Sequence, residues 1–364
     1  METTKNKVTL TTLAQALRLA PSTVSVCLSG KSAQYGVKPE TVRRVCEYAA
    51  KAGYVPNSAA RQLRGNRMPP VGLLFDQNIH AGEMIFKALN PALTALREGH
   101  RETRVVGSEN FADGIIQLRE LGCEEIIVFS KIVESPGTPD ELQQSLNAFL
   151  NASGNVTIYA VNYNFSDREH FLLPRMFRLG IHRQKIYAGL VNLLQRLGGG
   201  PVLQILWDGY DPASHADFLP PHPELQEYPY MLGRAWAADY LKLRRQRRFA
   251  AIAIGDDRTA AALMAELIAQ GVKIPEEVRI ISFDNLDFGE CLPVPLTSWG
   301  VPLWRHTQLV LHAILDGKEI PARVMSIPDF NWRQSAGIPE VEQRQFERWC
   351  EATLAAEPHM PSIS

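Results

Sequence analysis

From Val71 onward, short apolar runs alternate with longer stretches of helical periodicity. A helix that follows a buried strand returns the chain beside it, so repeated alternation predicts parallel sheets covered by helices on both faces. About 270 residues are long for one such domain, and we expect two doubly wound subdomains. The predicted strands are Val71–Phe75, Arg104–Val106, Ile126–Phe129, Val156–Val161, Val202–Trp207, Phe249–Ile254 and Arg279–Phe283, and the predicted helices lie near residues 84–98, 113–121, 183–197, 231–244, 258–271 and 303–315.

The N-terminal segment has helical spacing only and predicts a separate all-α unit. A first helix begins at Leu10, and a second begins at Pro21. Proline suits the first position of a helix, because the N–H that it lacks would have no hydrogen-bond partner within the helix. Two short helices joined by a tight turn form a helix-turn-helix. A third helix from Pro39 to about Ala52 would close a core to which it contributes Val42, Val45, Cys46 and Ala49.

Charge separates this unit from the rest of the chain. Residues 1–68 hold eleven lysines and arginines against three glutamates, although the whole chain has a net charge of −1. A basic helical unit on an acidic body is typical of proteins that bind nucleic acids. A solvated helical surface is the alternative, and the helix-turn-helix pattern favours DNA.

Four runs in this unit resemble one family of bacterial regulators. They are Val8–Ala16, Ser22–Ser25, Lys38–Arg43 and Gly53–Asn57, and together they are similar to the head of the LacI (lactose and purine repressor) family. The resemblance is close over the first 65 residues, and it is loose and abridged from there to about residue 340. It implies a hinge helix after the head, and then a periplasmic-binding-protein-like effector domain whose two subdomains the chain links three times.

On this resemblance we expect four segments. The three crossings between subdomains would lie near Asn162, within Leu286–Trp299 and near Arg323. The segments are a helix-turn-helix domain (1–56), a hinge helix and linker (57–70), an effector-binding and dimerisation domain (71–340; N-subdomain about 71–162 and 300–323, C-subdomain about 163–299 and 324–340) and a C-terminal tail (341–364).

The expected hinge helix, residues 57–64, is shorter than the roughly 12 residues that an isolated helix needs. It should therefore order only when two copies pack together on DNA. The resemblance places Leu63 where the family inserts a leucine into the minor groove to kink the duplex. An ordinary core leucine is the alternative.

The resemblance also implies which residues of the head contact DNA. Val26 stands where the family commonly has an arginine, and a valine can touch only thymine methyl groups or pack. Ala20 replaces the usual serine N-cap. The candidate DNA-binding residues are Thr9, Leu10, Pro21, Ser22, Thr23, Ser25, Val26, Lys38, Thr41, Asn57, Ala60, Leu63 and Arg64.

Polar clusters follow three predicted strands, where ligands of doubly wound sheets bind. The candidate ligand-binding residues are Asp76, Asn78, Asp256 and Asp284. Helix capping is the alternative for the 256–257 pair, and we expect it of Asp257. The family's ligand-clamping arginine is missing, because the segment from Trp207 to Pro229 has no convincing helix; Trp207, Tyr210 or Arg234 could replace it.

The sequence contains no catalytic pattern, and we expect no enzyme, cofactor or metal site. Its five cysteines and nine histidines lack ligand spacing, and no run of about 18 apolar residues predicts a membrane span. The predicted protein is a cytoplasmic, nucleoid-associated bacterial repressor, a homodimer that binds a pseudo-palindromic double-stranded operator under the control of a small polar metabolite such as a sugar. The alternative is a DNA-binding regulator whose effector pocket has decayed, constitutive or controlled by a protein partner.

Overall fold

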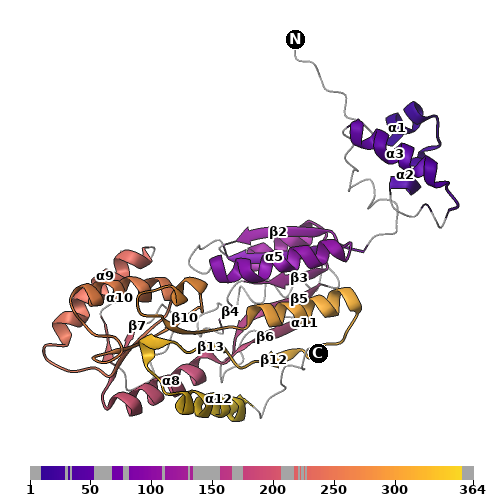
Figure 1. The fold of residues 1–364 in the computed structure, drawn as a ribbon. Helices are drawn as coiled ribbons and strands as arrows, with labels where there is room; N and C mark the ends of the chain where they lie inside the picture. Colours follow the sequence, from indigo (N-terminus) through magenta and orange to yellow (C-terminus); the bar gives the residue numbers. More distant parts are fainter. Residues whose placement is uncertain are drawn as a thin grey trace. The chain divides into compact units, whose positions relative to one another are not determined.

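The chain divides into two compact units, which we call the head (Met1–Met68) and the body (Pro69–Ser364). Figure 1 shows both in the computed structural model. The structure describes residues 10–28, 32, 35–52, 68–76, 82–108, 111–129, 132–133, 156–165, 175–205, 217–219, 222, 225 and 228–354.

In the described residues of the head, three helices surround one small core. They are α1 (Leu10–Leu17), α2 (Pro21–Leu28) and α3 (Pro39–Lys51), as the apolar spacing predicts. Cys46 is exposed, so its predicted place in the core is wrong; on α3 it follows Val45, whose side chain takes the core-facing position. The buried residues are Leu13, Ala14, Val24, Cys27, Val45 and Ala49.

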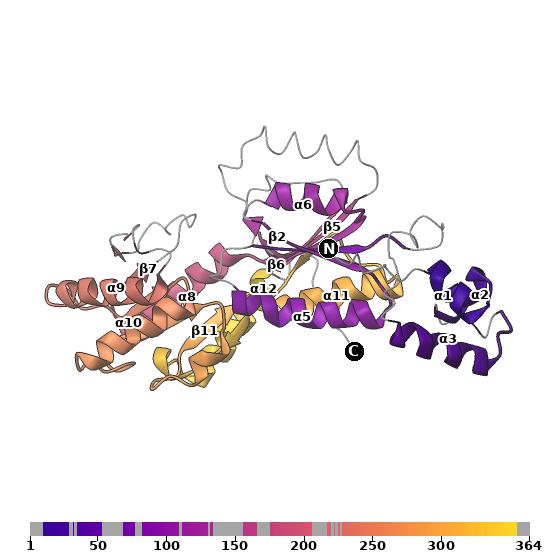
Figure 2. The ribbon, with the colours of Figure 1, turned by 90° about the horizontal axis from the view of Figure 1, so that it is seen from above.

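The first half of the body is a parallel sheet with helices on both faces. Its strands run in the order β12-β6-β5-β3-β1-β2, and β4 also pairs with β5. In Figure 2, α6 lies on one face of this sheet and α5 and α11 lie on the other. The elements are β1 (Val71–Asp76), α5 (Gly82–Glu98), β2 (Thr103–Ser108), α6 (Phe111–Glu120), β3 (Glu125–Val128), β4 (Ile132–Val133), β5 (Thr157–Asn164), β6 (Met176–Ile181), α11 (Leu303–Asp316) and β12 (Arg323–Met325).

The second half is built the same way, with strand order β13-β11-β10-β9-β7-β8. Among the strands described in this sheet, β13 alone runs antiparallel to its neighbour, which is β11. The fold class predicted from the sequence is thus confirmed. The elements are α8 (Arg183–Gly198), β7 (Val202–Ile205), β8 (Asp217–Phe218), α9 (Pro229–Leu243), β9 (Ala251–Ile254), α10 (Asp257–Ala269), β10 (Arg279–Phe283), η3 (Asp287–Glu290), β11 (Thr297–Gly300), β13 (Asp329–Asn331), η4 (Gln334–Ala336) and α12 (Glu340–Leu354).

The described part of the body passes between the halves three times, and the first crossing lies furthest from its predicted place. β6 pairs with β5, so the first crossing follows Ile181 and does not lie near Asn162. β10 and β11 pair in the second sheet, which moves the second crossing from 286–299 to residues 301–302. The third lies at 326–328, because β12 still pairs with β6.

The segment 341–364 is not simply a tail, because residues 340–354 form α12. Phe346, Cys350 and Leu354 are buried on this helix at four-residue spacing, which places them on one face. At Gly189 of α8, a Cβ would lie 2.4 Å from the Trp349 ring, so the missing side chain allows the two helices a close approach. α12 therefore belongs to the core of the second half.

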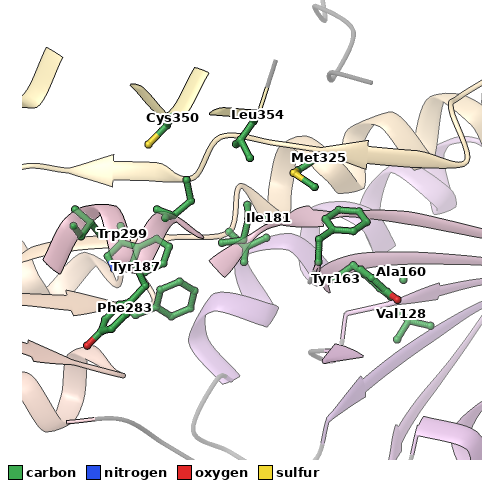
Figure 3. Close-up of a cluster of buried hydrophobic side chains, with 14 of the residues drawn as sticks. Val128, Ala160, Tyr163, Ile181, Tyr187, Phe283, Trp299, Met325, Cys350 and Leu354 are labelled. Carbon is green, nitrogen blue, oxygen red and sulfur yellow. The ribbon is translucent and has the colours of Figure 1, made fainter. Parts of the chain in front are cut away.

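One hydrophobic cluster runs through both halves of the body. It joins Val128 and Tyr163 of the first half to Phe283 and Trp299 of the second, and it includes α12. Figure 3 shows Ile181 and Met325, which lie at two of the crossings, among these side chains. The segments that connect the halves are thus packed into a shared core.

Substituting Gly233 should destabilise the second half. A Cβ there would lie 2.4 Å from the Thr259 carbonyl oxygen and 2.9 Å from the Leu263 nitrogen, both backbone atoms of α10 that cannot rotate away. We expect Gly233→Ala to lower the free energy of unfolding in urea by about 1–3 kcal/mol. Gly200→Ala is the control, since its nearest neighbour would be an ordinary 3.6 Å away. Equal stability of the two variants would contradict this packing.

Candidate functional site

The turn between α1 and α2 is closed by backbone hydrogen bonds. The N–H of Leu19 donates to the Ala14 carbonyl at 3.0 Å, and that of Arg18 donates to Gln15 at 3.2 Å. This pair of bonds is the Schellman arrangement that ends many helices, and it requires a left-handed residue. Arg18 supplies that conformation with φ of 53°.

An arginine is an unusual residue for this position, because glycine adopts left-handed backbone without strain. The conformation costs a non-glycine residue about 1–2 kcal/mol. A cation near the C-terminus of a helix regains only about 0.3–1 kcal/mol through the helix dipole. The dipole alone therefore leaves Arg18 short of full compensation.

The outward face of α2 is the candidate recognition surface. Pro21 and Ser22 are exposed and Ser25 and Val26 are half-buried, whereas Val24 and Cys27 point into the head core. Pro21 opens the helix behind Ala20, whose carbonyl accepts from the Val24 N–H at 3.2 Å. The structure thus presents two serines and one valine on a helix of suitable size for the major groove.

The other predicted DNA contacts are distributed as follows. Thr23 and Thr41 are half-buried, and Lys38 is exposed at the start of α3, where its carbonyl accepts from Thr41 N–H at 2.9 Å. Leu10 packs partly against the head core, so its side chain serves folding first. Thr9, Asn57, Ala60, Leu63 and Arg64 lie outside the described residues.

The head lacks carboxylates over the stretch that contains α1 and α2. No aspartate or glutamate occurs from residue 3 to residue 39, a segment that holds five lysines and arginines. Among the described contacts, the Arg44 guanidinium approaches the Leu17 carbonyl at 3.5 Å and thus lies at the C-terminal end of α1. The local charge is positive, and neighbouring side chains of this stretch cannot neutralise it.

In the body, the roles of two adjacent aspartates differ from the prediction. Asp256 is the N-cap of α10, and its Oδ1 accepts from the N–H groups of Arg258 at 3.1 Å and Thr259 at 2.9 Å. The sequence assigned capping to Asp257, so that interpretation was wrong by one residue. The ligand role proposed for Asp256 must therefore coexist with its role as a cap.

Asp257 is fully buried and ties two loops together. Its Oδ2 accepts from the Leu286 N–H and its Oδ1 accepts from the Ser298 hydroxyl, both at 2.6 Å. Burial raises the pKa of its carboxyl group to about 6, against the lowering effect of the bonds from Ser298 and Leu286. Asp257 thus fixes the segment that follows β10 to the strand ends of the second sheet.

Asp284 begins that segment in strained backbone. Its φ is 107°, that of Asn285 is 55°, and the Asp284 N–H donates to the Trp299 carbonyl at 3.0 Å. Asp256 and Asp284 follow neighbouring parallel strands, so they lie at the same edge of the second sheet. Asp76 ends β1 of the first sheet, and Asn78 lies outside the described residues. The structure therefore brings together two of the four predicted ligand residues.

Arg183 joins the two halves, and the sequence did not single it out. Its Nη2 donates to the Asn162 Oδ1 at 3.2 Å in the first half, and its guanidinium lies 4.5 Å from the ring centroid of Phe283 in the second. The side chain is 4% exposed. One signal existed, because Arg183 is the first residue of α8 and a cation there opposes the helix dipole.

His306 stabilises the crossing region. Burial lowers its pKa to about 4, so the ring is neutral at physiological pH. Nδ1 lies 2.8 Å from the Val161 carbonyl and must carry the hydrogen, which leaves Nε2 to accept from the Ser326 hydroxyl at 2.8 Å. The ring thereby links α11 and β5 to the third crossing.

Other predicted features find little support as sites. Arg234 lies 3.4 Å from the Glu266 carboxylate and its side chain is 73% exposed, so it forms a surface ion pair on α9. Trp207 and Tyr210 lie outside the described residues.

Within the described ranges, no cluster of three histidine, cysteine or acidic side chains could hold a metal ion. Nor is any described helix long and apolar enough to cross a membrane.

Comparison with known proteins gives matches over both units. The periplasmic binding protein-like domain family matches residues 213–336. The HTH-type transcriptional regulator AscG of Escherichia coli is 22% identical over 325 residues, which are 84% of this chain and 91% of AscG. The HTH-type transcriptional regulator GntR of Pseudomonas aeruginosa is 25% identical over 338 residues, 87% of this chain and 92% of that protein.

A solved structure shows the same fold. The Lac repressor dimer, bound to operator and the anti-inducer ONPF, superposes with a TM-score of 0.66 at 16% identity, covering 91% of this chain and 99% of that one. Together with the two regulators, this match confirms the resemblance to the LacI family that the head sequence indicates.

The buried carboxyl group of Asp257 should make the free energy of unfolding depend on pH. Its pKa of about 6 exceeds the ordinary 3.8, so between these values the folded chain holds a proton that the unfolded chain has lost. The resulting stability is fully present below about pH 4 and is lost as the pH rises through about 6. Relative to Asp257→Asn, wild type should lose about 3 kcal/mol of unfolding free energy between about pH 4 and pH 7.

Chemical unfolding at a series of pH values measures this difference. Asp113→Asn is the control, because Asp113 is exposed on α6, and the stability of this variant should follow the wild-type pH curve. Parallel pH curves for wild type and Asp257→Asn would contradict the assignment.

Proposed function

We propose that this chain, whose resemblance to the LacI family extends over most of its length, is a transcriptional regulator that binds double-stranded DNA through its head. The observation that carries the proposal is a helix-turn-helix with an outward face of small side chains in an acid-free, basic segment. A recognition helix of this kind enters the major groove and reads base edges. The proposed boundaries are 1–56 for the helix-turn-helix domain, 57–70 for the hinge and linker, and 71–354 for the effector part, which includes α12.

Within the head, α2 reads the operator. Ser22 and Ser25 supply hydroxyls for base edges, and Val26 contacts thymine methyl groups. Lys38 and Thr41 bind the backbone at the start of α3. In the hinge that follows the three helices, Leu63 is the wedge that opens the central base step, and Asn57, Ala60 and Arg64 lie beside it in the sequence.

The regulator acts as a homodimer. Exposed apolar side chains support this proposal, because apolar surface that is contiguous often marks a protein–protein contact. Phe86 on α5 is 49% exposed and Val105 on the edge strand β2 is 45% exposed. In the second half, Tyr228, Tyr230 and Met231 are exposed at the start of α9. These two patches are the proposed subunit contacts.

A small polar metabolite controls the regulator from the place where the two halves meet. Asp256 and Asp284 would bind hydroxyl groups from the second half, and Asp76 and Asn78 would do so from the first. A ligand held by both halves favours one relative arrangement of them, and the first half connects directly to the hinge. Coupling of this kind typically amounts to about 1–3 kcal/mol.

One observation favours the alternative in which the pocket no longer binds a ligand. Oδ1 of Asp256 already caps α10, and the Arg183 guanidinium already binds Asn162 and stacks on Phe283. In a DNA-binding protein that is constitutive, or controlled by a protein partner, Asp256 and Arg183 would serve only these structural contacts and would bind no ligand. In both cases the protein is a cytoplasmic regulator and not an enzyme.

Selection from random double-stranded DNA tests the main proposal. The purified full chain should enrich a pseudo-palindrome with two half-sites whose centres lie about 10 base pairs, or a multiple of that, apart, because two heads read successive major grooves. Sedimentation of the complex should show two chains per site. Enrichment of one unrepeated half-site would argue against the dimer, and absence of any enrichment would remove the DNA-binding proposal.

A thermal-shift panel tests the effector. D-glucose, D-gluconate and adenine represent sugars, sugar acids and nucleobases; a true ligand at about 100 times its Kd adds about 2.7 kcal/mol of stability. Asp284→Asn should abolish that shift and leave DNA binding intact, because asparagine tolerates the positive φ and the residue lies in the body. No shift with any compound in a broad metabolite panel would favour the alternative.

A further inference from the structure

The Arg18 position combines backbone strain with an accessible charge. It holds a left-handed conformation that glycine would adopt freely, yet a long cationic side chain occupies it and is exposed. A strained residue persists where the surrounding structure imposes it and frequently serves a function. Glycine could form the same turn, so the charge of Arg18 is not needed for folding and is available to bind a partner.

The residues that precede and follow Arg18 in the chain offer its guanidinium no carboxylate. In the part of the chain that the structure describes, the Arg18 guanidinium makes no ion pair or hydrogen bond. Residues 3–39 contain no carboxylate side chain, and Arg44 brings a second guanidinium to the end of α1 through its contact with Leu17. Two cations at one helix end repel each other unless an anion lies near them.

We propose that Arg18 binds a backbone phosphate of the DNA beside the groove that α2 enters. The residue stands three positions before Pro21, the first residue of the recognition helix, so its side chain projects from the turn that leads into that helix. The contact positions α2 on the duplex and reads no base. The inference rests on the proposed function, and it assigns a residue of the turn, outside the helix itself, to DNA binding.

The salt dependence of DNA binding tests the proposal. Full-length wild type and Arg18→Gly are titrated onto a random-sequence duplex at several salt concentrations. The plot of log K against log salt has a negative slope, and each lost phosphate contact makes it less steep by roughly 0.9. We expect that change for each head. Affinity should fall most at low salt. Amide hydrogen exchange across α1 and α2 should be unchanged or slower in the variant, because glycine relieves the strain.

Two controls separate charge from backbone. Arg175 in the body has a nearly identical φ of 56° and is also exposed, so Arg175→Gly should leave the salt slope unchanged. Arg18→Lys keeps the charge and should keep the wild-type slope. An unchanged slope in Arg18→Gly, an equal change in Arg175→Gly, or faster exchange in α1 of Arg18→Gly would overturn the proposal. A wild type that binds no duplex would instead overturn the proposed function.

Discussion

Parallel sheets must be covered on both faces, and the organisation of the body depends on this constraint. The first sheet meets it with α6 on one face and α5 and α11 on the other. The second sheet uses α9 and α10 on one face, whereas α8 shares the other with α12. The aromatic ring of Phe346 packs against Phe330 and Trp332 of the antiparallel edge region. Without α12, that part of the sheet would face water.

The same constraint explains what the sequence could and could not predict. Runs such as Ala251–Ile254 are apolar throughout because both of their faces are buried, and periodicity identifies them. The apolar pattern does not identify β6 as a strand, because Arg178 and Gly180 interrupt its apolar run. Since β6 is the last strand before the first crossing, missing it displaced the predicted boundary to Asn162. The helical spacing of Phe346, Cys350 and Leu354 was present in the sequence but was assigned to a tail.

For the candidate sites, sequence predicts residue types more securely than their partners. The double aspartate after β9 indicates a cap and a second polar role, but only backbone geometry decides that Asp256 caps α10 and that Asp257 turns inward to Leu286 and Ser298. The Arg183 side chain is held by contacts with Asn162 and Phe283, two residues that are distant from it in the sequence. No local pattern contains such a contact. On α2, by contrast, the candidate residues Pro21 and Ser22 are exposed, as a role in DNA contact requires.

The discontinuous first half has a consequence for synthesis on the ribosome. Its sheet starts with β1 at Val71 and acquires its edge strand, β12, only at Arg323–Met325. The head closes its core with residues that are near one another in the chain, so it can fold as soon as it emerges. The first half must wait, with one edge of β6 unpaired, until Arg323–Met325 has been translated. A nascent chain therefore carries a folded head and an incomplete first half from the time α3 emerges until β12 has been made.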